Sequence, residues 1–286
     1  MNIKDYLTSV SNELLHFCPN PGNGGDAFIS HATYQLFDEL KIKYKIVKST
    51  DNLAGKIIVY GGGGNLVDYY SYGADFLEKH FKESKKLIVF PHTINAGEKL
   101  LKLFNNNTDI ICREKKSFNF VKNTETNANV ILMDDMAFNI NIEKTFSDAK
   151  KISNKTQFDL HYFSQSNKFR LAKVGRCLYR TSNNNTLNSF RIDQERTSKK
   201  IPRDNFDISI KFGILTFTPN IALRISCLLL KYLDKFEIIN TNRLHMGIGG
   251  AILGKEVNFY PNSYWKNECV YHYSMKNKYQ NVNWMG

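Results

Sequence analysis

The chain has 286 residues, 42% of them hydrophobic, so it can bury one large core or two smaller ones. Its net charge of +12 indicates partners that carry negative charge, such as a phosphorylated substrate, an anionic lipid or nucleic acid. The basic residues are spread along the chain, which is equally typical of an ordinary solvated surface. Because the sequence has no continuous basic stripe and no RNA-binding motif, we predict no nucleic-acid partner.

The remaining composition argues for a reducing compartment. The five cysteines lack C-x-x-C spacing, which argues against a disulfide framework and against a zinc site. The amphipathic N-terminus lacks the apolar core of a signal peptide, and the apolar stretch 221–233 is too short to span a bilayer. We expect a cytoplasmic protein, with peripheral contact at the inner face of the plasma membrane left open. Asp134 and Asp135 are the best metal-ligand pair, but without further ligands they predict no metal.

In chain order, the first half alternates helices with short strands. The periodicity predicts helices over 3–16, 26–41, 72–82, 96–104 and 115–123, and strands over 44–47, 56–60, 87–90, 109–112 and 130–132. Such alternation is typical of a parallel, doubly wound sheet.

The second half begins less regularly. Residues 145–205 are rich in Asn, Ser, Lys and Arg, with 174–179 as the clearest apolar run, and predict a linker and the irregular opening of a second domain. Alternation then resumes, with helices predicted over 219–234, 243–254 and 264–276 and strands over 236–240 and 256–260. We therefore predict two α/β domains with parallel sheets, residues 1–145 and 146–286.

The segment from Ile238 to Gly247 is the most informative in the chain. An apolar strand pattern breaks at small polar residues and a Gly-rich helix pattern follows, which places Arg243 and His245 in the first helical turn. Free N–H groups and the positive end of the helix dipole lie there, so two cationic side chains are locally disfavoured. The arrangement is explained if an anion sits between them and the helix.

Two glycine-rich loops also follow predicted strands or precede helices. In the loop 21–26, bare backbone at Gly25 lets a ligand approach, while Asn23 and Asp26 can bind hydroxyls. The loop 61–65 combines four glycines, including Gly63, with Asn65. A simple helix-entry loop and close packing of a strand on a helix explain these loops equally well. Neither has the spacing of a phosphate-binding or dinucleotide-binding loop.

Three further residues occupy predicted strand ends, the edge at which α/β sheets bind ligands. His92 follows a buried strand and is a candidate acid, base or hydroxyl binder. Arg113 would be costly to bury without an anion, although pairing with Glu114 or a nearby Asp at the rim would also explain it. Arg191 lies in a segment of mixed charge, for which an exposed strand with ordinary ion pairs is the simpler explanation.

The ordered set of these motifs resembles the polysaccharide pyruvyl transferase family over about residues 20–265. The matching motifs are Asn23-x-Gly25-Asp26, Gly61 to Asn65, Pro91-His92-Thr93, Cys112-Arg113-Glu114 and Arg243-Leu244-His245. The resemblance implies two Rossmann-like domains arranged as in GT-B glycosyltransferases, with the active site in the interdomain cleft. It places the acceptor on the N-terminal side and phosphoenolpyruvate on the C-terminal side.

The resemblance also implies an activity. The family transfers pyruvate from phosphoenolpyruvate onto two hydroxyls of a sugar in a surface or capsular polysaccharide precursor, giving a cyclic ketal and phosphate. Phosphoenolpyruvate is then a donor substrate, no cofactor is implied, and the acceptor is expected to be a lipid-linked oligosaccharide. The catalytic residues implied are His245, Arg243 and Arg113. The substrate-binding residues expected beside them are Asn23, Gly25, Asp26, Gly63, Asn65, His92, Leu244 and Arg191.

The chemistry of the residues fits this activity. Two Arg side chains can each grip the phosphate or carboxylate of phosphoenolpyruvate through two hydrogen bonds, a role expected of Arg243 and Arg113. One imidazole can serve as general acid and base in turn, the role expected of His245. Two alternatives stay open at this point: a glycosyltransferase that uses a nucleotide-sugar on the same scaffold, and a non-catalytic glycan-binding protein.

Overall fold

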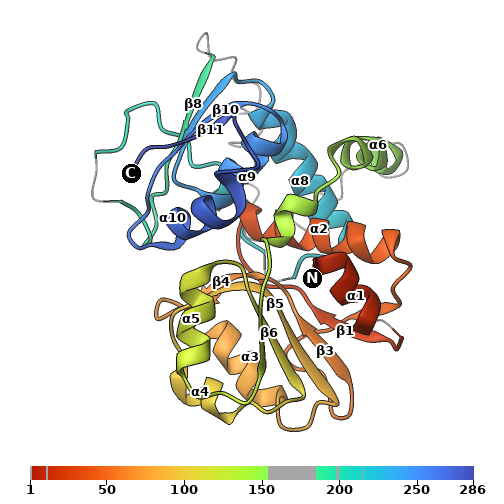
Figure 1. Ribbon diagram of the computed structural model, residues 1–286. Helices are drawn as coiled ribbons and strands as arrows, with labels where there is room; N and C mark the ends of the chain where they lie inside the picture. Colours follow the sequence, from red (N-terminus) through yellow and green to blue (C-terminus); the bar gives the residue numbers. More distant parts are fainter. Residues whose placement is uncertain (1, 11, 154–184, 198–199, 215) are drawn as a thin grey trace.

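The computed structural model describes the chain except residues 1, 11, 154–184, 198–199 and 215 (Figure 1). The predicted apolar run 174–179 therefore lies outside the described residues. The first sheet contains β1 (Leu15–Cys18), β2 (Tyr44–Ile46), β3 (Ile57–Tyr60), β4 (Gly63–Leu66), β5 (Lys86–Ile94), β6 (Thr108–Cys112) and β7 (Asn129–Leu132). The second contains β8 (Thr186–Ser189), β9 (Ile238–Thr241), β10 (Glu256–Phe259) and β11 (Val282–Trp284).

The pairings in both sheets are parallel, so the predicted α/β class with parallel sheets is confirmed. The first sheet runs β2-β1-β3-β5-β6-β7, with β4 paired to β5, and the second runs β11-β10-β9-β8. Strand order in the first sheet reverses beside β1, because β2 lies on one side of it and β3 on the other. A switch point of this kind opens a crevice at the carboxyl ends of the strands.

Helices cover both faces of the first sheet (Figure 1). The chain forms α1 (Ile3–Val10), α2 (Gly24–Glu39), α3 (Tyr72–His80), α4 (Glu98–Leu103), α5 (Lys115–Asn123), α6 (Ile142–Ser153), α8 (Pro219–Leu233), α9 (Leu244–Ile252) and α10 (Lys266–Val270). Three shorter helical segments are η1 (Met136–Asn139), η2 (Ser209–Phe212) and the π-helical η3 (Tyr271–Met275). One apolar cluster packs α3, α4 and α5 on one face, and alternate strand residues such as Ile58 and Val59 point to opposite faces.

Helix α2 connects the two sheets. Its apolar residues share one continuous core with β1, α8, α9 and β10, so this core runs from the first sheet to the second. Polar residues of the helix are also buried and are hydrogen-bonded: Tyr34 Oη donates to the carbonyl of Phe217 at 2.6 Å, and His31 Nε2 lies 2.8 Å from Thr145 Oγ1. The N-terminus of α2 is thereby fixed at the crevice of the first sheet.

The second sheet carries a ladder of asparagines across its four strands. Asn188, Asn240, Asn258 and Asn283 stand in register, on the face opposite the apolar residues Leu187, Ile239, Val257 and Val282. Asn240 Nδ2 donates to Asn188 Oδ1 at 2.9 Å, and Asn258 Nδ2 donates to Asn240 Oδ1 at 2.9 Å. Asn188 Nδ2 completes the ladder by donating to Asp204. Neighbouring amides therefore satisfy one another's hydrogen bonds on this half-exposed face of the sheet.

Several predicted elements need correction. The helix predicted over 3–16 ends at Val10, and β1 begins at Leu15. The strand predicted to stop at Phe90 continues through Pro91 to Ile94, because a register shift between Val89 and His92 accommodates a residue without an N–H group.

Other differences lie at turns and ends. The glycine loop after β3 leads directly into strand β4, and the helix predicted over 264–276 is divided into α10 and η3. Strand β11 was not predicted, and the segment after Arg191 is not a strand. The boundary predicted between residues 145 and 146 falls inside α6, and the division into domains stays a prediction.

The ladder makes a testable contribution to stability. We expect Asn240→Ala to lower the free energy of unfolding by about 1–3 kcal/mol, because it removes two hydrogen bonds and takes their partner from Asn188 Oδ1 and Asn258 Nδ2. Asn283→Ala is the matched control: it loses one 3.3 Å contact at an exposed end, so its effect should stay within about 0.5 kcal/mol. Urea denaturation measures the free energy of unfolding of both variants. Equal losses of stability in the two variants would contradict a cooperative ladder.

Candidate active site

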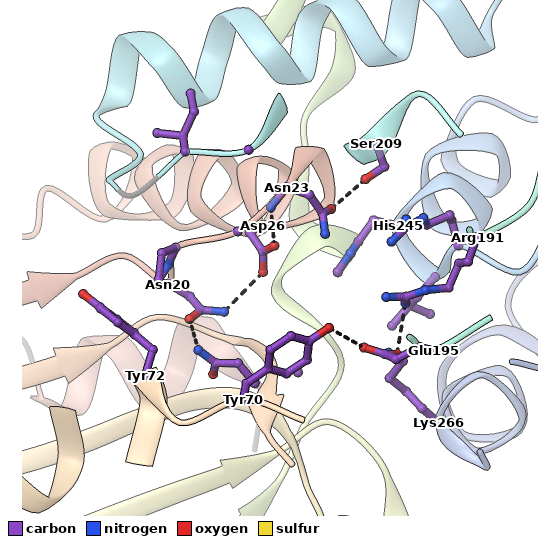
Figure 2. Close-up of a pocket in the computed structure, with 18 of the residues that line it drawn as sticks. Asn20, Asn23, Asp26, Tyr70, Tyr72, Arg191, Glu195, Ser209, His245 and Lys266 are labelled. Carbon is purple, nitrogen blue, oxygen red and sulfur yellow. Dashed lines mark hydrogen bonds and ion pairs between the residues drawn. The ribbon is translucent and has the colours of Figure 1, made fainter. Parts of the chain in front are cut away.

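A cavity of about 470 Å³ lies between the carboxyl ends of strands from the two sheets (Figure 2). Its polar and charged lining residues are Asn20, Asn23, Asp26, Asn65, Tyr70, Tyr72, Arg113, Arg191, Glu195, Ser209, Arg243, His245 and Lys266. The lining residues from Asn20 to Arg113 lie in or next to the elements of the first sheet. Those from Arg191 to Lys266 lie next to the elements of the second sheet. The carboxyl ends of parallel strands are the expected place for a ligand.

The N-terminus of α2 forms one wall through a capping box. Asn23 Oδ1 accepts from the backbone N–H of Gly25 at 2.9 Å, and Asp26 Oδ2 accepts from the N–H of Asn23 at 2.8 Å. Asn20 Nδ2 donates to Asp26 Oδ1 at 3.2 Å, and Ser209 Oγ donates to Asn23 Oδ1 at 2.6 Å. Burial raises the pKa of Asp26 in spite of nearby His245, so this carboxyl can exist protonated closer to neutral pH than an exposed one.

The N-termini of α2 and α9 meet at Gly25 and His245. A Cβ at Gly25 would lie 2.3 Å from His245 Nδ1 and 3.0 Å from its Cγ, so only glycine leaves room for the imidazole. His245 lies in the first turn of α9, and Arg243 is the N-cap residue, as the sequence predicts. The predicted turn from strand to helix is thus confirmed, and the N-terminus of α2 packs directly against His245.

His245 is also paired with a buried carboxylate. Its Nε2 lies 3.4 Å from Asp135 Oδ2, which also accepts from Arg113 Nη1 at 2.7 Å. Asp135 is fully buried, which alone would raise its pKa, but His245 and Arg113 hold that pKa below its usual range. Asp135 is therefore ionised and lies beside the Nε2 edge of the imidazole, where Nε2 is buried and makes no hydrogen bond among the described residues.

Arg113 is almost fully buried yet reaches the cavity. Its Nε donates to Thr93 Oγ1 at 2.8 Å, and a Cβ at Gly64 would lie 2.8 Å from its Nη2. The bare backbone of Gly64 is what allows this approach. Glu114 does not pair with Arg113: its side chain caps α5 by accepting from the backbone N–H of Ser117 at 2.9 Å. Of the two partners that the sequence allowed, Glu114 or a nearby Asp, Glu114 is wrong and Asp135 is the partner, in a buried pair and not at the rim.

The second sheet contributes a chain of alternating charges. Arg243 donates through Nε to Asp207 at 2.8 Å and contacts Asp193 at 2.8 Å through Nη2. Arg191 binds the same Asp193 at 2.9 Å and Glu195 at 3.0 Å. Arg191 thus belongs to the site's charge network and is not an exposed rim residue.

Lys266 ends this chain and was not predicted. Its ammonium is buried and paired with Glu195, whose carboxylate it shares with Arg191. Burial lowers the pKa of Lys266 to about 7, aided by Arg191 and Arg113 and opposed by Glu195. A lysine that changes charge near neutral pH can respond to the charge of a bound ligand.

His92, Gly63 and Gly25 do not line the cavity, unlike the other predicted residues. His92 is fully buried, and burial lowers its pKa to about 3, which favours the neutral imidazole. Its Nε2 lies 2.9 Å from Asn65 Oδ1 and so orients that side chain. Asn65 Nδ2 donates in turn to Asn20 Oδ1 at 2.6 Å. We correct the role of His92 from a substrate contact to a residue that positions Asn65.

Several lining residues were missed because they follow irregular loops. Lys266, Tyr70 and Ser209 lie in polar or aromatic stretches without a glycine loop or strand end to mark them. Asn20 follows β1, and it was missed because no strand was predicted there and the predicted helix 3–16 overlaps the start of β1. Correct assignment of β1 would have placed Asn20 at a strand end like Asn65 and Arg113.

The cavity is lined by buried charges that compensate one another. Four cations, Arg113, Arg191, Arg243 and Lys266, are matched by four carboxylates, Asp135, Asp193, Asp207 and Glu195. A ligand with several negative charges can recruit donors from these pairs, and protonation of Asp26 or Lys266 can offset its charge. Among the described residues, no group of three or more His, Cys, Asp or Glu side chains could hold a metal ion. In the described part of the chain, no helix is long and apolar enough to cross a membrane.

Comparison with known proteins agrees with this geometry. The chain is similar to "Putative pyruvyl transferase EpsO" of Bacillus subtilis (strain 168), with 25% identity over 94% of this chain and 87% of that protein. It also resembles the crystal structure of the uncharacterized protein KP1_0663 from Klebsiella pneumoniae, with 28% identity, a TM-score of 0.79, and coverage of 99% of this chain and 96% of that one. The family model for polysaccharide pyruvyl transferases matches residues 23–264. The chain therefore belongs to the polysaccharide pyruvyl transferase family.

Proposed function

We propose that the protein transfers pyruvate from phosphoenolpyruvate to two hydroxyls of one sugar in a surface polysaccharide precursor, forming a cyclic ketal and releasing phosphate. The observation that carries this proposal is the meeting of His245, Arg113 and Lys266 in one cavity at the N-terminus of α9. A donor with both a phosphate and a carboxylate needs several cations beside a proton-transferring group. We further infer that the two sheets belong to Rossmann-like halves arranged as in GT-B enzymes, with this cavity as their interdomain cleft.

The chemistry divides into two steps. In the first, a sugar hydroxyl forms a bond to C2 of phosphoenolpyruvate and gives up its proton, while C3 gains a proton and becomes a methyl group. In the second, the bond from C2 to the phosphate oxygen breaks and the second hydroxyl attacks C2. The phosphate takes the proton of that hydroxyl, so atoms and charge balance.

His245 is positioned to move these protons. With Nε2 beside the carboxylate of Asp135 at 3.4 Å, Nδ1 can accept a hydroxyl proton and return it later. Asp26 is a second proton-binding group next to the imidazole, because burial raises its pKa. We assign Asn23, Asn65 and Asp26 to the sugar hydroxyls.

The anionic donor fits the opposite side. Arg243 is held by Asp207 and Asp193, which bind its Nε and Nη2 and fix its position. These contacts do not use Nη1, which can therefore bind the donor. Arg113 reaches past Gly64 through Nη2, and Lys266 approaches the same glycine from the second sheet, with its Cδ 4.0 Å from the Cβ position there. We therefore assign the donor's charged groups to Arg113, Lys266, Arg243 and the N–H groups of α9.

The acceptor and the location of the protein are inferred from the family. Polysaccharide precursors are assembled on lipid carriers, so we propose a cytoplasmic protein that meets a lipid-linked oligosaccharide at the inner face of the membrane. Family membership supports pyruvyl transfer over the nucleotide-sugar glycosyltransferase and over the non-catalytic alternative.

The identity of the donor can be tested by ligand-induced stabilisation. We expect phosphoenolpyruvate at saturating concentration to raise the melting temperature by a few degrees, because it binds only the folded state. Nucleotide-sugars at the same concentration serve as the comparison and should have no effect. If nucleotide-sugars stabilise the protein and phosphoenolpyruvate does not, the glycosyltransferase hypothesis is supported and this proposal is rejected.

The role of His245 predicts a loss of chemistry with little loss of binding. We expect His245→Asn to reduce phosphate release from phosphoenolpyruvate by about a hundredfold or more, since a general acid–base contributes about that much. Stabilisation by phosphoenolpyruvate should persist. His272→Asn, at an exposed histidine, is the control and should keep full turnover. Near wild-type turnover of His245→Asn would remove it from the mechanism.

Lys266 predicts a pH dependence of donor binding. Its pKa of about 7 means that the ammonium is lost as pH rises through neutrality, and a negative ligand binds the ammonium better than the amine. Affinity for phosphoenolpyruvate should therefore fall between pH ~7 and ~9, by up to about tenfold per unit. Lys266→Arg keeps its charge and should flatten this profile. Calorimetric titrations across that range decide, and identical profiles would exclude Lys266 as the titrating group.

A further inference from the structure

Four aromatic side chains gather at the cavity mouth and are not used by the mechanism above. Tyr69 and Tyr70 lie in the loop between β4 and α3, and Tyr264 and Trp265 directly precede α10. We call these four residues the aromatic rim. Tyr69 is 49% exposed and Tyr70 is 40% exposed, although a tyrosine ring held only for packing would usually be covered.

The rings of the rim form a chain that links the two sheets. The centroids of Tyr69 and Tyr264 lie 6.5 Å apart, those of Tyr69 and Tyr70 6.4 Å apart, and those of Tyr264 and Trp265 5.5 Å apart. Lys116 of α5 places its Nζ 5.6 Å from the centre of the Trp265 ring. A chain of rings in edge-to-face or tilted contact, with a cation beside it, thus runs from the loop after β4 to the residues before α10.

The rim is continuous with the cavity. Tyr70 lines the cavity and its hydroxyl donates to Glu195 Oε1 at 3.4 Å, as Figure 2 shows. The ring of Tyr264 lies 5.1 Å from Lys266 Nζ. The Tyr264 hydroxyl is buried and has no hydrogen-bond partner among the described residues, which leaves a donor for a ligand group. A ligand in the cavity can therefore reach the rim at Tyr70, which lines the cavity, and at Tyr264, which contacts Lys266.

The chemistry of the rim suits a sugar. A pyranose ring has an apolar face of C–H groups that packs on an aromatic ring, while its edge of hydroxyls needs donors and acceptors such as Lys116 and the Tyr264 hydroxyl. We propose that the aromatic rim binds the sugar residue adjacent to the modified one, as a subsite for the acceptor glycan. The inference rests on the proposed function only because it assigns the modified sugar to the cavity.

The two tryptophans of the chain allow a direct binding test. Trp284 of β11 stacks on Tyr271 at 5.4 Å, so Trp284→Phe leaves Trp265 as the single tryptophan while keeping an aromatic ring. The probe is the surface polysaccharide of the source organism, treated with mild acid to remove its ketals and cut into oligosaccharides. We expect a saturable change in Trp265 emission. If Trp265 emission does not change although the wild-type protein transfers pyruvate to the same oligosaccharides, the rim is not a subsite. The proposed function is unaffected by that result.

Substitutions in the rim distinguish a subsite from a structural role. We expect Tyr69→Ala to weaken oligosaccharide binding and to raise KM for the oligosaccharide by about tenfold, with KM for phosphoenolpyruvate unchanged. Tyr69→Phe should restore wild-type values. Leu103→Ala is the control, since Leu103 is 56% exposed but lies outside the rim. An unchanged KM for the oligosaccharide overturns the subsite, whereas binding without any pyruvyl transfer supports the rim and refutes the proposed function.

Discussion

The contact between Gly25 and His245 is the constraint on which the site depends. Helix α2 begins at the first sheet and α9 at the second, and their N-termini meet where a side chain at residue 25 would displace the imidazole. The shared core around α2 holds both helices in place, so the distance is set by packing and not by the two residues alone. A single glycine therefore fixes the imidazole of His245 against the loop that begins α2, the two parts to which we assign proton transfer and hydroxyl binding.

The buried charges follow from the same geometry. Bringing two strand-end clusters together places Arg113, Arg191 and Arg243 in a space with little water, and each needs a carboxylate partner. Asp193 is shared by Arg191 and Arg243, and Glu195 is shared by Arg191 and Lys266. Among these described ion pairs, Asp207 is the carboxylate that binds a single cation, Arg243. Shared carboxylates keep donors in position while leaving some of them for an incoming anion.

Much of this site was predictable because strand ends share one edge of a sheet. Arg113, Asn65 and the turn with Arg243 and His245 could be placed from short apolar runs followed by polar residues. Side-chain direction could not: His92 follows the same rule, yet the bulge at Pro91 turns it into the core beside Asn65. Lys266 could not be found either, because its partner Glu195 lies 71 residues away and only the tertiary fold joins them.

Apart from Arg113, which follows β6 of the first sheet, the two walls of the cavity differ in polarity, and this difference orients the proposed reaction. The wall from the first sheet and α2 presents the amides of Asn20, Asn23 and Asn65, which are hydrogen-bonded to one another or to Asp26 and Ser209. Amides both donate and accept, as sugar hydroxyls require, whereas guanidinium and ammonium groups only donate, as phosphate and carboxylate require. Because His245 lies at the border between these walls, protons leaving the hydroxyls and protons reaching the donor can pass through one imidazole.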